Sequence, residues 1–314
     1  MSNSIETSSE ITTVAGPASA GPVAAVLGRF GGAGGITFGQ VLGVAPFLIF
    51  ALFFLILPTL RLAASAFYDS DGNFTFQNII DLNQPQILKA YWISMRVSVA
   101  SAALGALFGL LIAIAVIRGR LPDWIRSAVM TFSGVASQFA GIPLAFAFIA
   151  SLGRLGMVTL ILKMFGIDIY GAGFNLLSFW GLTITYLYFQ IPLMVLIIAP
   201  AVDGLKREWG EAAATLGAST WQFWRYVGLP VLWPNLLGTL SLLFANAFGA
   251  VATAYALTGS SLNIVPILLY AQIGGDVLHN PGLGAALALG MVIITGLANV
   301  VYLIVRTRAE RWLK

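Results

Sequence analysis

Long stretches of the chain carry no charged side chain, and their lengths predict membrane-spanning helices. Five stretches contain no Asp, Glu, Lys or Arg: Val97–Ile117, Ser127–Gly153, Tyr170–Val202, Tyr226–Gly275 and Val277–Val305. About 20 apolar residues in a helix cross the ~30 Å hydrocarbon core of a bilayer. Because several stretches reach that length, the pattern predicts an all-α polytopic membrane protein rather than a large soluble helical bundle.

Polar breaks divide this pattern into six predicted transmembrane helices. We expect them at residues 41–65, 92–117, 124–151, 176–200, 232–257 and 283–306. The apolar segments 154–166 and 263–274 are too short to span a bilayer, and we expect re-entrant or interfacial helices there, on one side of the membrane. Residues 1–40, rich in Ser, Ala, Gly and Pro, predict a flexible tail and lack the pattern of a secretory signal, so residues 41–314 form the predicted membrane domain.

Composition supports a membrane protein and excludes several kinds of chemistry. The chain is 59% hydrophobic and 9% charged, whereas soluble domains carry about 25% charged residues. The net charge of +4 does not indicate nucleic-acid binding, because the basic residues lie scattered in loops. There is no cysteine, which excludes disulfides, thiolate catalysis and cysteine metal sites.

The distribution of basic residues orients the predicted helices. Loops that face the cytoplasm carry an excess of Lys and Arg. One side of the predicted bundle holds Arg29, Arg118, Arg120, Arg126, Lys206, Arg207, Arg225, Arg306, Arg308, Arg311 and Lys314. The other side holds Arg61, Lys89, Arg96, Arg154 and Lys163. We therefore expect both termini, and the polar stretch between the fourth and fifth spans, in the cytoplasm.

That polar stretch predicts two short helices joined by a fixed elbow. Glu208–Leu216 contains good helix formers, and Gly217 can adopt the left-handed conformation that ends a helix. Ser219 followed by Gln222 is a capping-box pattern that begins a second helix, which we expect Pro230 to close. The stretch is either a rigid knob for docking on another protein or a solvated connector that happens to be helical.

The spacing of particular residues in this stretch resembles a known signature. Glu211-Ala212-Ala213, three residues, Gly217, nine residues, Val227, one residue and Leu229-Pro230 follow in order. They resemble the EAA motif of ABC-transporter importer permeases, from which the chain departs once, because that motif has Ile where Val227 stands. The resemblance covers about residues 43–314.

The resemblance implies a mechanism and a set of partners. In such permeases the EAA helix is a coupling helix that docks into a groove on a cytoplasmic ATPase subunit. It implies a coupling region at about 203–230, with these ATPase-coupling residues: Glu211, Ala212, Ala213, Gly217, Leu229 and Pro230. The chain contains no Walker A sequence, so we expect no enzymatic activity or cofactor here and place ATP and Mg²⁺ on two separate ATPase subunits. The further implied partners are a second, different permease and a periplasmic solute-binding protein, at a bacterial inner membrane.

No Asp or Glu lies in the predicted spans, which disfavours ion-driven transport. The polar residues that remain within the spans are neutral, and these are the candidates for lining a pathway. The candidates are Gln138, Gln190, Asn246, Tyr186 and Tyr255. Each could equally hold helices together. Gly105–Gly109 is a small-xxx-small pattern that predicts close helix packing. We expect no catalytic or metal site, because the lone His279 has no partner ligands nearby in sequence.

The general layout resembles the polyamine-type branch of these permeases, through "FAGIPLAFAFIASLG" and "NPGLGAALALG". This resemblance implies import of spermidine or putrescine; ferric iron, thiamine and an aminophosphonate are the alternatives within the importer class. A passive channel or facilitator without an ATPase is the alternative outside it.

Overall fold

The computed structural model describes residues 38–69, 72–119, 121–259, 261–274 and 280–310, and these residues are helical apart from loops and one isolated bridge between Tyr68 and Phe74. The chain forms two compact units, one up to Arg61 and one from Leu62 onward. Residues 1–37, which make up nearly all of the predicted tail, lie outside the described residues, as does His279.

The described part of the first unit is one apolar helical segment. It comprises α2 (Phe38–Ala51), a π-helical turn η1 (Leu52–Ile56) and the start of α3 (Leu57–Ser65), which continues into the second unit. Leu42–Ser65 is long and apolar enough to cross a membrane, in agreement with the span predicted at 41–65.

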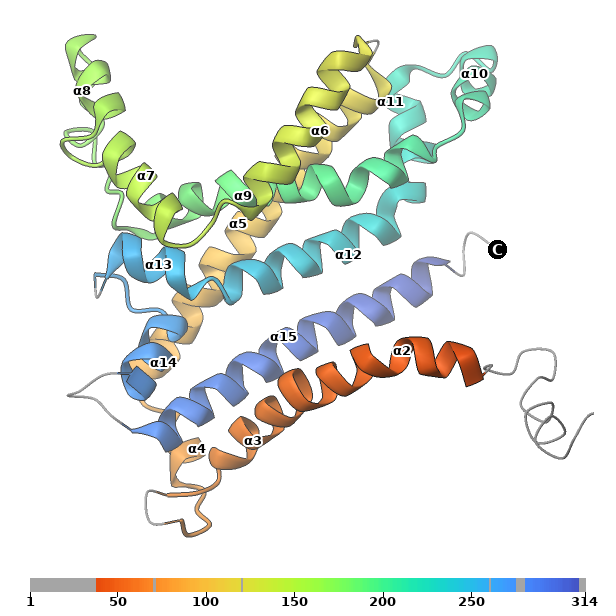
Figure 1. Ribbon diagram of the computed structural model, residues 1–314. Coiled ribbons are helices and arrows are strands. Elements are labelled where there is room, and N and C mark those ends of the chain that lie inside the picture. The colour runs from red at the N-terminus through yellow and green to blue at the C-terminus, as the bar shows by residue number, and fades with distance from the viewer. Residues whose placement is uncertain (1–37, 70–71, 120, 260, 275–279, 311–314) are drawn as a thin grey trace, which may run out of the picture. The chain divides into compact units, whose positions relative to one another are not determined.

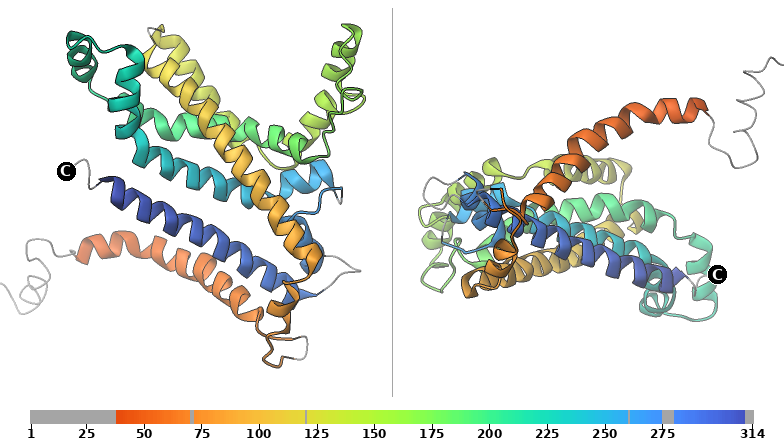
Figure 2. Two further views of the ribbon diagram at one scale, coloured as in Figure 1. Left: turned by 180° about the vertical axis from the view of Figure 1, so that it is seen from behind. Right: turned by 90° about the horizontal axis from the view of Figure 1, so that it is seen from below.

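The second unit is a bundle of long helices with short helices at both ends (Figure 1). After α3 its helices are α4 (Gln77–Asp81), α5 (Pro85–Arg118), α6 (Asp123–Gln138), α7 (Ile142–Leu152), α8 (Met157–Met164), α9 (Phe179–Asp203), α10 (Arg207–Thr215), α11 (Thr220–Phe223), the π-helical η2 (Trp224–Gly228), α12 (Leu229–Phe248), α13 (Val251–Thr258), α14 (Val265–Gly274) and α15 (Pro281–Glu310). The short helices α10 and α11 lie at one end, while α8 and α14 lie at the other (Figures 1 and 2). As predicted, the polar stretch between the fourth and fifth spans therefore lies at one end of the bundle, and the two short apolar segments lie at the other end.

Close packing of α5 against α9 forms the centre of the second unit. A Cβ atom at Gly109 would lie 2.5 Å from Met194 Cβ and 2.8 Å from the Ile191 carbonyl oxygen, so only glycine permits this approach. The close packing predicted from the small-xxx-small pattern is thus confirmed. Two apolar clusters surround this contact, one around Tyr186 and Phe189 and the other around Met194 and Ile198.

The expected number of spans agrees with the structure, but three predictions are wrong in detail. Two predicted spans are broken, and the segment 154–166, expected to be too short to span, lies largely within the candidate span Ile142–Met164. Within the described residues six helices are long and apolar enough to cross a membrane: Leu42–Ser65, Pro85–Arg118, Ile142–Met164, Phe179–Asp203, Thr220–Phe248 and Pro281–Thr307. The helix predicted at 124–151 is broken between α6 and α7, where Gly141 has φ 76° and ψ −149° and Pro143 follows in the first turn of α7. The helix predicted at 232–257 is broken between α12 and α13.

Candidate functional site

The end of α10 forms the rigid elbow that the sequence predicts. Gly217 has φ 77°, a left-handed conformation that residues with a Cβ rarely adopt. The Gly217 N–H donates to the Ala214 carbonyl and the Ala218 N–H donates to the Ala213 carbonyl, each at 2.9 Å. This pair of hydrogen bonds is a Schellman motif. It fixes the direction in which the chain leaves the helix.

The second arm of the elbow begins with the predicted capping box. The Gln222 N–H donates to Ser219 Oγ at 3.3 Å, and the Ser219 N–H donates to Gln222 Oε1 at 2.7 Å. The expectation that Pro230 closes this arm is wrong, because Pro230 lies in the first turn of α12 and the helix runs on from Thr220 to Phe248. Proline has no N–H and its ring crowds the preceding turn. The π-helical turn η2 directly before it accommodates that proline.

The elbow presents an open surface. None of the residues of α10 is buried, and the side chains of Leu216, Trp221 and Tyr226 are 87%, 68% and 68% exposed. Glu211 and Ala212 are also exposed, and Glu211 forms no side-chain hydrogen bond or ion pair with a described residue. Exposed aromatic and aliphatic residues beside small ones are typical of a protein-binding surface.

Two arginines attach the other end of α10 to the bundle. The Arg118 guanidinium at the end of α5 donates to the Leu205 carbonyl, and Leu205 is only 2% exposed. Arg126 in α6 forms an ion pair with Asp203 at 3.2 Å. These contacts fasten residues 203–205, which lead directly into α10. In the sequence both arginines indicate only the orientation of the spans, and nothing in their spacing indicates these partners.

The two broken spans share one backbone geometry. The Ala140 N–H donates to the Gln138 carbonyl at 3.1 Å across Phe139, which has φ −82° and ψ 86°. The Val251 N–H donates to the Gly249 carbonyl at 2.8 Å across Ala250, which has φ −76° and ψ 66°. Both are inverse γ-turns. Each turn interrupts the ladder of helical hydrogen bonds and leaves carbonyl groups on one side and N–H groups on the other without helical partners.

The breaks meet at a cavity of about 430 Å³. The Gly141 N–H donates to Thr253 Oγ1 at 2.7 Å, which joins α7 to α13. The residues that line this cavity are Ser137, Gln138, Ala140, Gly141, Phe189, Ala245, Asn246, Gly249, Ala250, Val251, Ala252 and Thr253. Irregular backbone at membrane depth is tolerated where it lines a water-filled cavity or is buried in protein. Polar backbone and two amide side chains therefore face one uncharged chamber.

The candidate pathway residues separate into different environments. Gln138 and Asn246 are exposed and line the cavity. Tyr186 is buried and its hydroxyl donates to the Ala250 carbonyl at 2.9 Å, which holds the second break in place. Gln190 is fully buried; its Nε2 donates to the Leu243 carbonyl at 2.9 Å, and its Oε1 has no partner among the described residues. Tyr255 lies outside this lining, with its ring centroid 5.1 Å from that of Tyr270.

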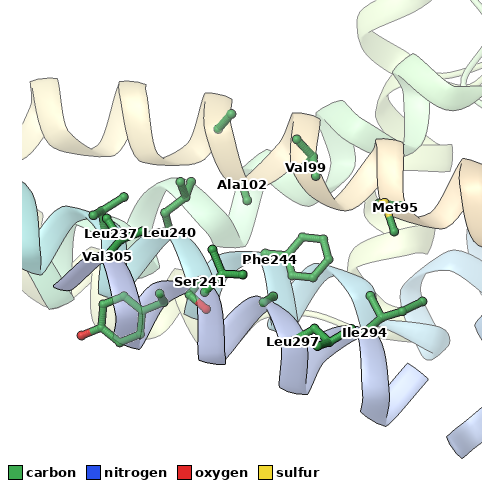
Figure 3. A pocket seen from close by; sticks show the side chains of 14 residues that line it. Met95, Val99, Ala102, Leu237, Leu240, Ser241, Phe244, Ile294, Leu297 and Val305 are labelled. Atoms are coloured by element: carbon green, nitrogen blue, oxygen red, sulfur yellow. The ribbon is translucent and has the colours of Figure 1, made fainter. Parts of the chain in front are cut away.

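A second cavity of about 480 Å³ has a different character. It is a groove between α5, α12 and α15, lined almost entirely by aliphatic and aromatic side chains such as Val99, Leu240 and Phe244 (Figure 3). Ser241 and Tyr302 are its polar residues. Because a charged or strongly hydrated solute would lose its hydration there without replacement, this groove is unsuited to carrying one.

Comparison with known proteins decides the family. Residues 105–314 match the family described as "Binding-protein-dependent transport system inner membrane component". This match covers two thirds of the chain. The chain belongs to this family. It is therefore a membrane permease component of the ABC-importer type.

Relatives of this permease include proteins with named substrates. It is 31% identical over 169 residues to the "Probable sulfate transport system permease protein cysT" of Anthoceros angustus, an alignment covering 53% of this chain and 55% of that relative. A protein of the same name from Chlorella vulgaris is 26% identical, with 59% of its length covered. The "Molybdenum transport system permease protein ModB" of Mycobacterium bovis is 27% identical over 221 residues, covering 69% of this chain and 78% of that one. These relatives give no support to the polyamine-type branch expected from the sequence.

Solved structures support the fold. A bacterial ABC transporter involved in the import of the acidic polysaccharide alginate has a chain with a TM-score of 0.66 and 18% identity, covering 87% of this permease and 95% of that chain. A chain of the MetNI methionine ABC transporter in inward-facing conformations gives a TM-score of 0.56 at 15% identity, covering 71% and 95%.

Proposed function

We propose that this permease forms half of the translocation pathway of an ATP-driven bacterial importer for an inorganic oxyanion of the sulfate or molybdate class. The observation that carries the coupling mechanism is the α10–α11 elbow. Its left-handed Gly217, its capping box and its exposed apolar side chains provide a rigid, accessible knob. In this proposal the knob docks on an ATPase subunit, and ATP and Mg²⁺ are bound there.

Movement of the α10–α11 elbow can be transmitted to the helical bundle through two segments. One runs through residues 203–205, which Arg118 and Arg126 hold against the ends of α5 and α6. The other runs through the continuous helix from Thr220 into α12, which ends at the second break. A displacement of α10 would therefore reach the cavity between the breaks through α12, while α9 and α5 resist it.

The cavity between the breaks is the proposed pathway segment in this subunit. Amide groups of Gln138 and Asn246 and the backbone N–H groups of Ala252 and Thr253, at the start of α13, can donate hydrogen bonds to an anion. None of the residues that line it carries a charge, so an anion would be solvated without being held tightly, as transport requires. A polyamine would need carboxylates to balance its charge, and none lines this cavity. The names of the sulfate and molybdenum relatives point to the same class.

We further propose that the complete importer contains a second permease, two ATPase subunits and a periplasmic binding protein in the inner membrane. Both termini of this chain and the elbow face the cytoplasm in this proposal. Purification of the tagged chain distinguishes a second copy of it from a different permease: a complex containing only this permease would contradict the heterodimer. A reporter fused after Lys314 that becomes active only in the periplasm should stay silent.

Uptake by intact cells tests the function. Cells lacking the gene and cells carrying it on a plasmid are supplied with ³⁵S-sulfate, ⁹⁹Mo-molybdate or ¹⁴C-spermidine. We expect uptake of one oxyanion to depend on the gene and on ATP. Gene-dependent spermidine uptake without oxyanion uptake would refute the substrate class, and uptake that continues after ATP depletion would favour the passive facilitator.

A further inference from the structure

A polar cavity of about 470 Å³ is lined by residues of α8 and of the loops beside it. The helix α8 itself lies at the end of the second unit opposite α10 (Figures 1 and 2). This polar cavity is separate from the cavity between the breaks, and the two share no lining residue. Its polar lining comes from α8 and from the loop segments on either side of that helix. The polar residues are Arg154, Thr159, Lys163, Asp168, Tyr170 and Asn175.

Arg154 supplies a positioned guanidinium. Its Cζ lies 5.7 Å from the centroid of the Tyr170 ring, and the Tyr170 hydroxyl donates to the Leu152 carbonyl at 2.9 Å. The ring is thereby anchored and the guanidinium rests on its face. Within the described residues Arg154 forms no ion pair, so its N–H groups remain available to an acceptor.

Thr159 is a second donor without a protein partner. The residue is 5% exposed, and its Oγ1 is buried with no hydrogen-bond partner among the described residues. A buried hydroxyl without a partner costs free energy unless a ligand or water satisfies it. Thr159 and Arg154 line the same cavity, and together they point to a ligand with acceptor atoms.

The remaining polar groups leave an excess of positive charge. Lys163 and Asp168 are 3.9 Å apart and both are well exposed, so their ion pair is weak. The Asp168 carboxylate also accepts from the Gly171 N–H at 2.9 Å. Asn175 Oδ1 accepts from the Leu177 N–H at 3.0 Å, which leaves its amide N–H₂ as a donor. The cavity is thus lined by two cations, two neutral donors and one carboxylate. That carboxylate, of Asp168, already accepts a hydrogen bond from the Gly171 N–H.

We propose that this cavity binds a tetrahedral oxyanion. The same chemistry is offered by a free sulfate or molybdate ion and by the phosphate of a lipid headgroup, since each presents several acceptor oxygens around one negative centre. Arg154 is the principal contact, because its planar guanidinium can donate two parallel hydrogen bonds to such a group. Lys163 adds charge and Thr159 adds the inner hydrogen bond. The free-ion form rests on the proposed oxyanion substrate, whereas the headgroup form does not.

Binding to the purified protein tests this site. The full-length chain, with the subunits that co-purify, is studied in phosphate-free maltoside detergent. One arm measures ³⁵S-sulfate binding by equilibrium dialysis, and the other measures retained phosphatidylglycerol by native mass spectrometry. The test variant is Arg154→Gln. The matched control is Arg96→Gln, because Arg96 is another exposed arginine stacked on an aromatic ring, 5.2 Å from the centroid of Phe179, outside this cavity.

We expect Arg154→Gln to weaken binding in one arm by roughly tenfold, the effect of losing a charge-assisted hydrogen bond, while Arg96→Gln matches the wild type. Loss in the sulfate arm identifies the free ion, and loss in the lipid arm identifies the headgroup. Thr159→Val, which keeps the side-chain shape, should weaken binding of the same ligand. This variant replaces Arg154→Gln as the test if Arg154→Gln does not fold.

Equal binding by the wild type, Arg154→Gln and Thr159→Val in both arms would overturn the proposal. If cells import an oxyanion through this permease and both arms are nevertheless unaffected, only this site is refuted. If cells import no oxyanion, the proposed substrate fails, and the lipid arm still decides what the cavity binds.

Discussion

Replacement of Gly217 by valine should uncouple ATP hydrolysis from transport. Gly217 has φ 77°, and a residue with a Cβ in the left-handed region costs about 1–2 kcal/mol, with a β-branched residue at the upper end. No atom lies within 4 Å of a Cβ placed there, so the cost comes from the backbone and not from a clash. Because α10 has no buried residue to hold it, the elbow would relax.

The size of the effect follows from that strain. A cost of about 1–2 kcal/mol lowers the population of the native elbow geometry, relative to other geometries, by a factor of roughly 5–30. We expect ATP-dependent uptake by Gly217→Val to fall by a comparable factor. The close packing of α5 against α9 at Gly109 and Met194 involves no elbow residue, so the amount of folded protein in the membrane should not change.

Two matched variants separate backbone strain from other effects. Gly217→Asn adds a side chain that tolerates the left-handed region, so it should restore most of the uptake. Gly210→Ala introduces a Cβ into open space within α10 itself and should transport at the wild-type rate. Uptake and ATP hydrolysis are measured together in proteoliposomes containing the complete complex. A wild-type ratio of uptake to hydrolysis in Gly217→Val, or an equal loss in Gly210→Ala, would refute the reasoning.

Three further variants test other parts of the permease. Arg118→Met removes the hydrogen bond to the Leu205 carbonyl, which is worth about 1.5–3 kcal/mol for a charged donor. Uptake should fall more than ATP hydrolysis in the same proteoliposomes. Equal losses of uptake and hydrolysis would contradict the role of this attachment. Thr253→Val removes the acceptor of the Gly141 N–H and should lower the unfolding free energy by about 1 kcal/mol; Thr253→Ser should not. Gly109→Val overfills the contact with α9 and should cost about 1–3 kcal/mol, seen as lower monodisperse yield on size-exclusion chromatography; a wild-type yield would contradict the packing.

The geometry of the α10–α11 elbow could be predicted from the sequence because local chemistry determines it. A left-handed glycine, a capping pair and good helix formers act within a few residues, and the structure has each of them at Gly217 and Ser219. The role of Pro230 was missed, because a proline at the start of a helix and one after its end have the same appearance in a sequence.

The broken spans were harder to predict. Gly141 and Pro143 lie within an apolar run whose length suggested one continuous helix. The second break, at Ala250, has no proline at all, and a γ-turn places no strong demand on residue type. Among the amides, Gln138 and Gln190 both lie in apolar surroundings in the sequence. Only the packing of helices distant in sequence exposes one and buries the other.

Site-specific cross-linking tests most directly whether the elbow couples this permease to an ATPase. The chain has no cysteine, so a single introduced cysteine can carry a photoreactive benzophenone at a chosen position. In membranes containing the native complex, Ala212→Cys on α10 should cross-link to a protein with a Walker A sequence. Leu155→Cys, 87% exposed between α7 and α8 at the opposite end, should not. Cross-linking of the ATPase through Leu155→Cys and not through Ala212→Cys would contradict the proposed coupling.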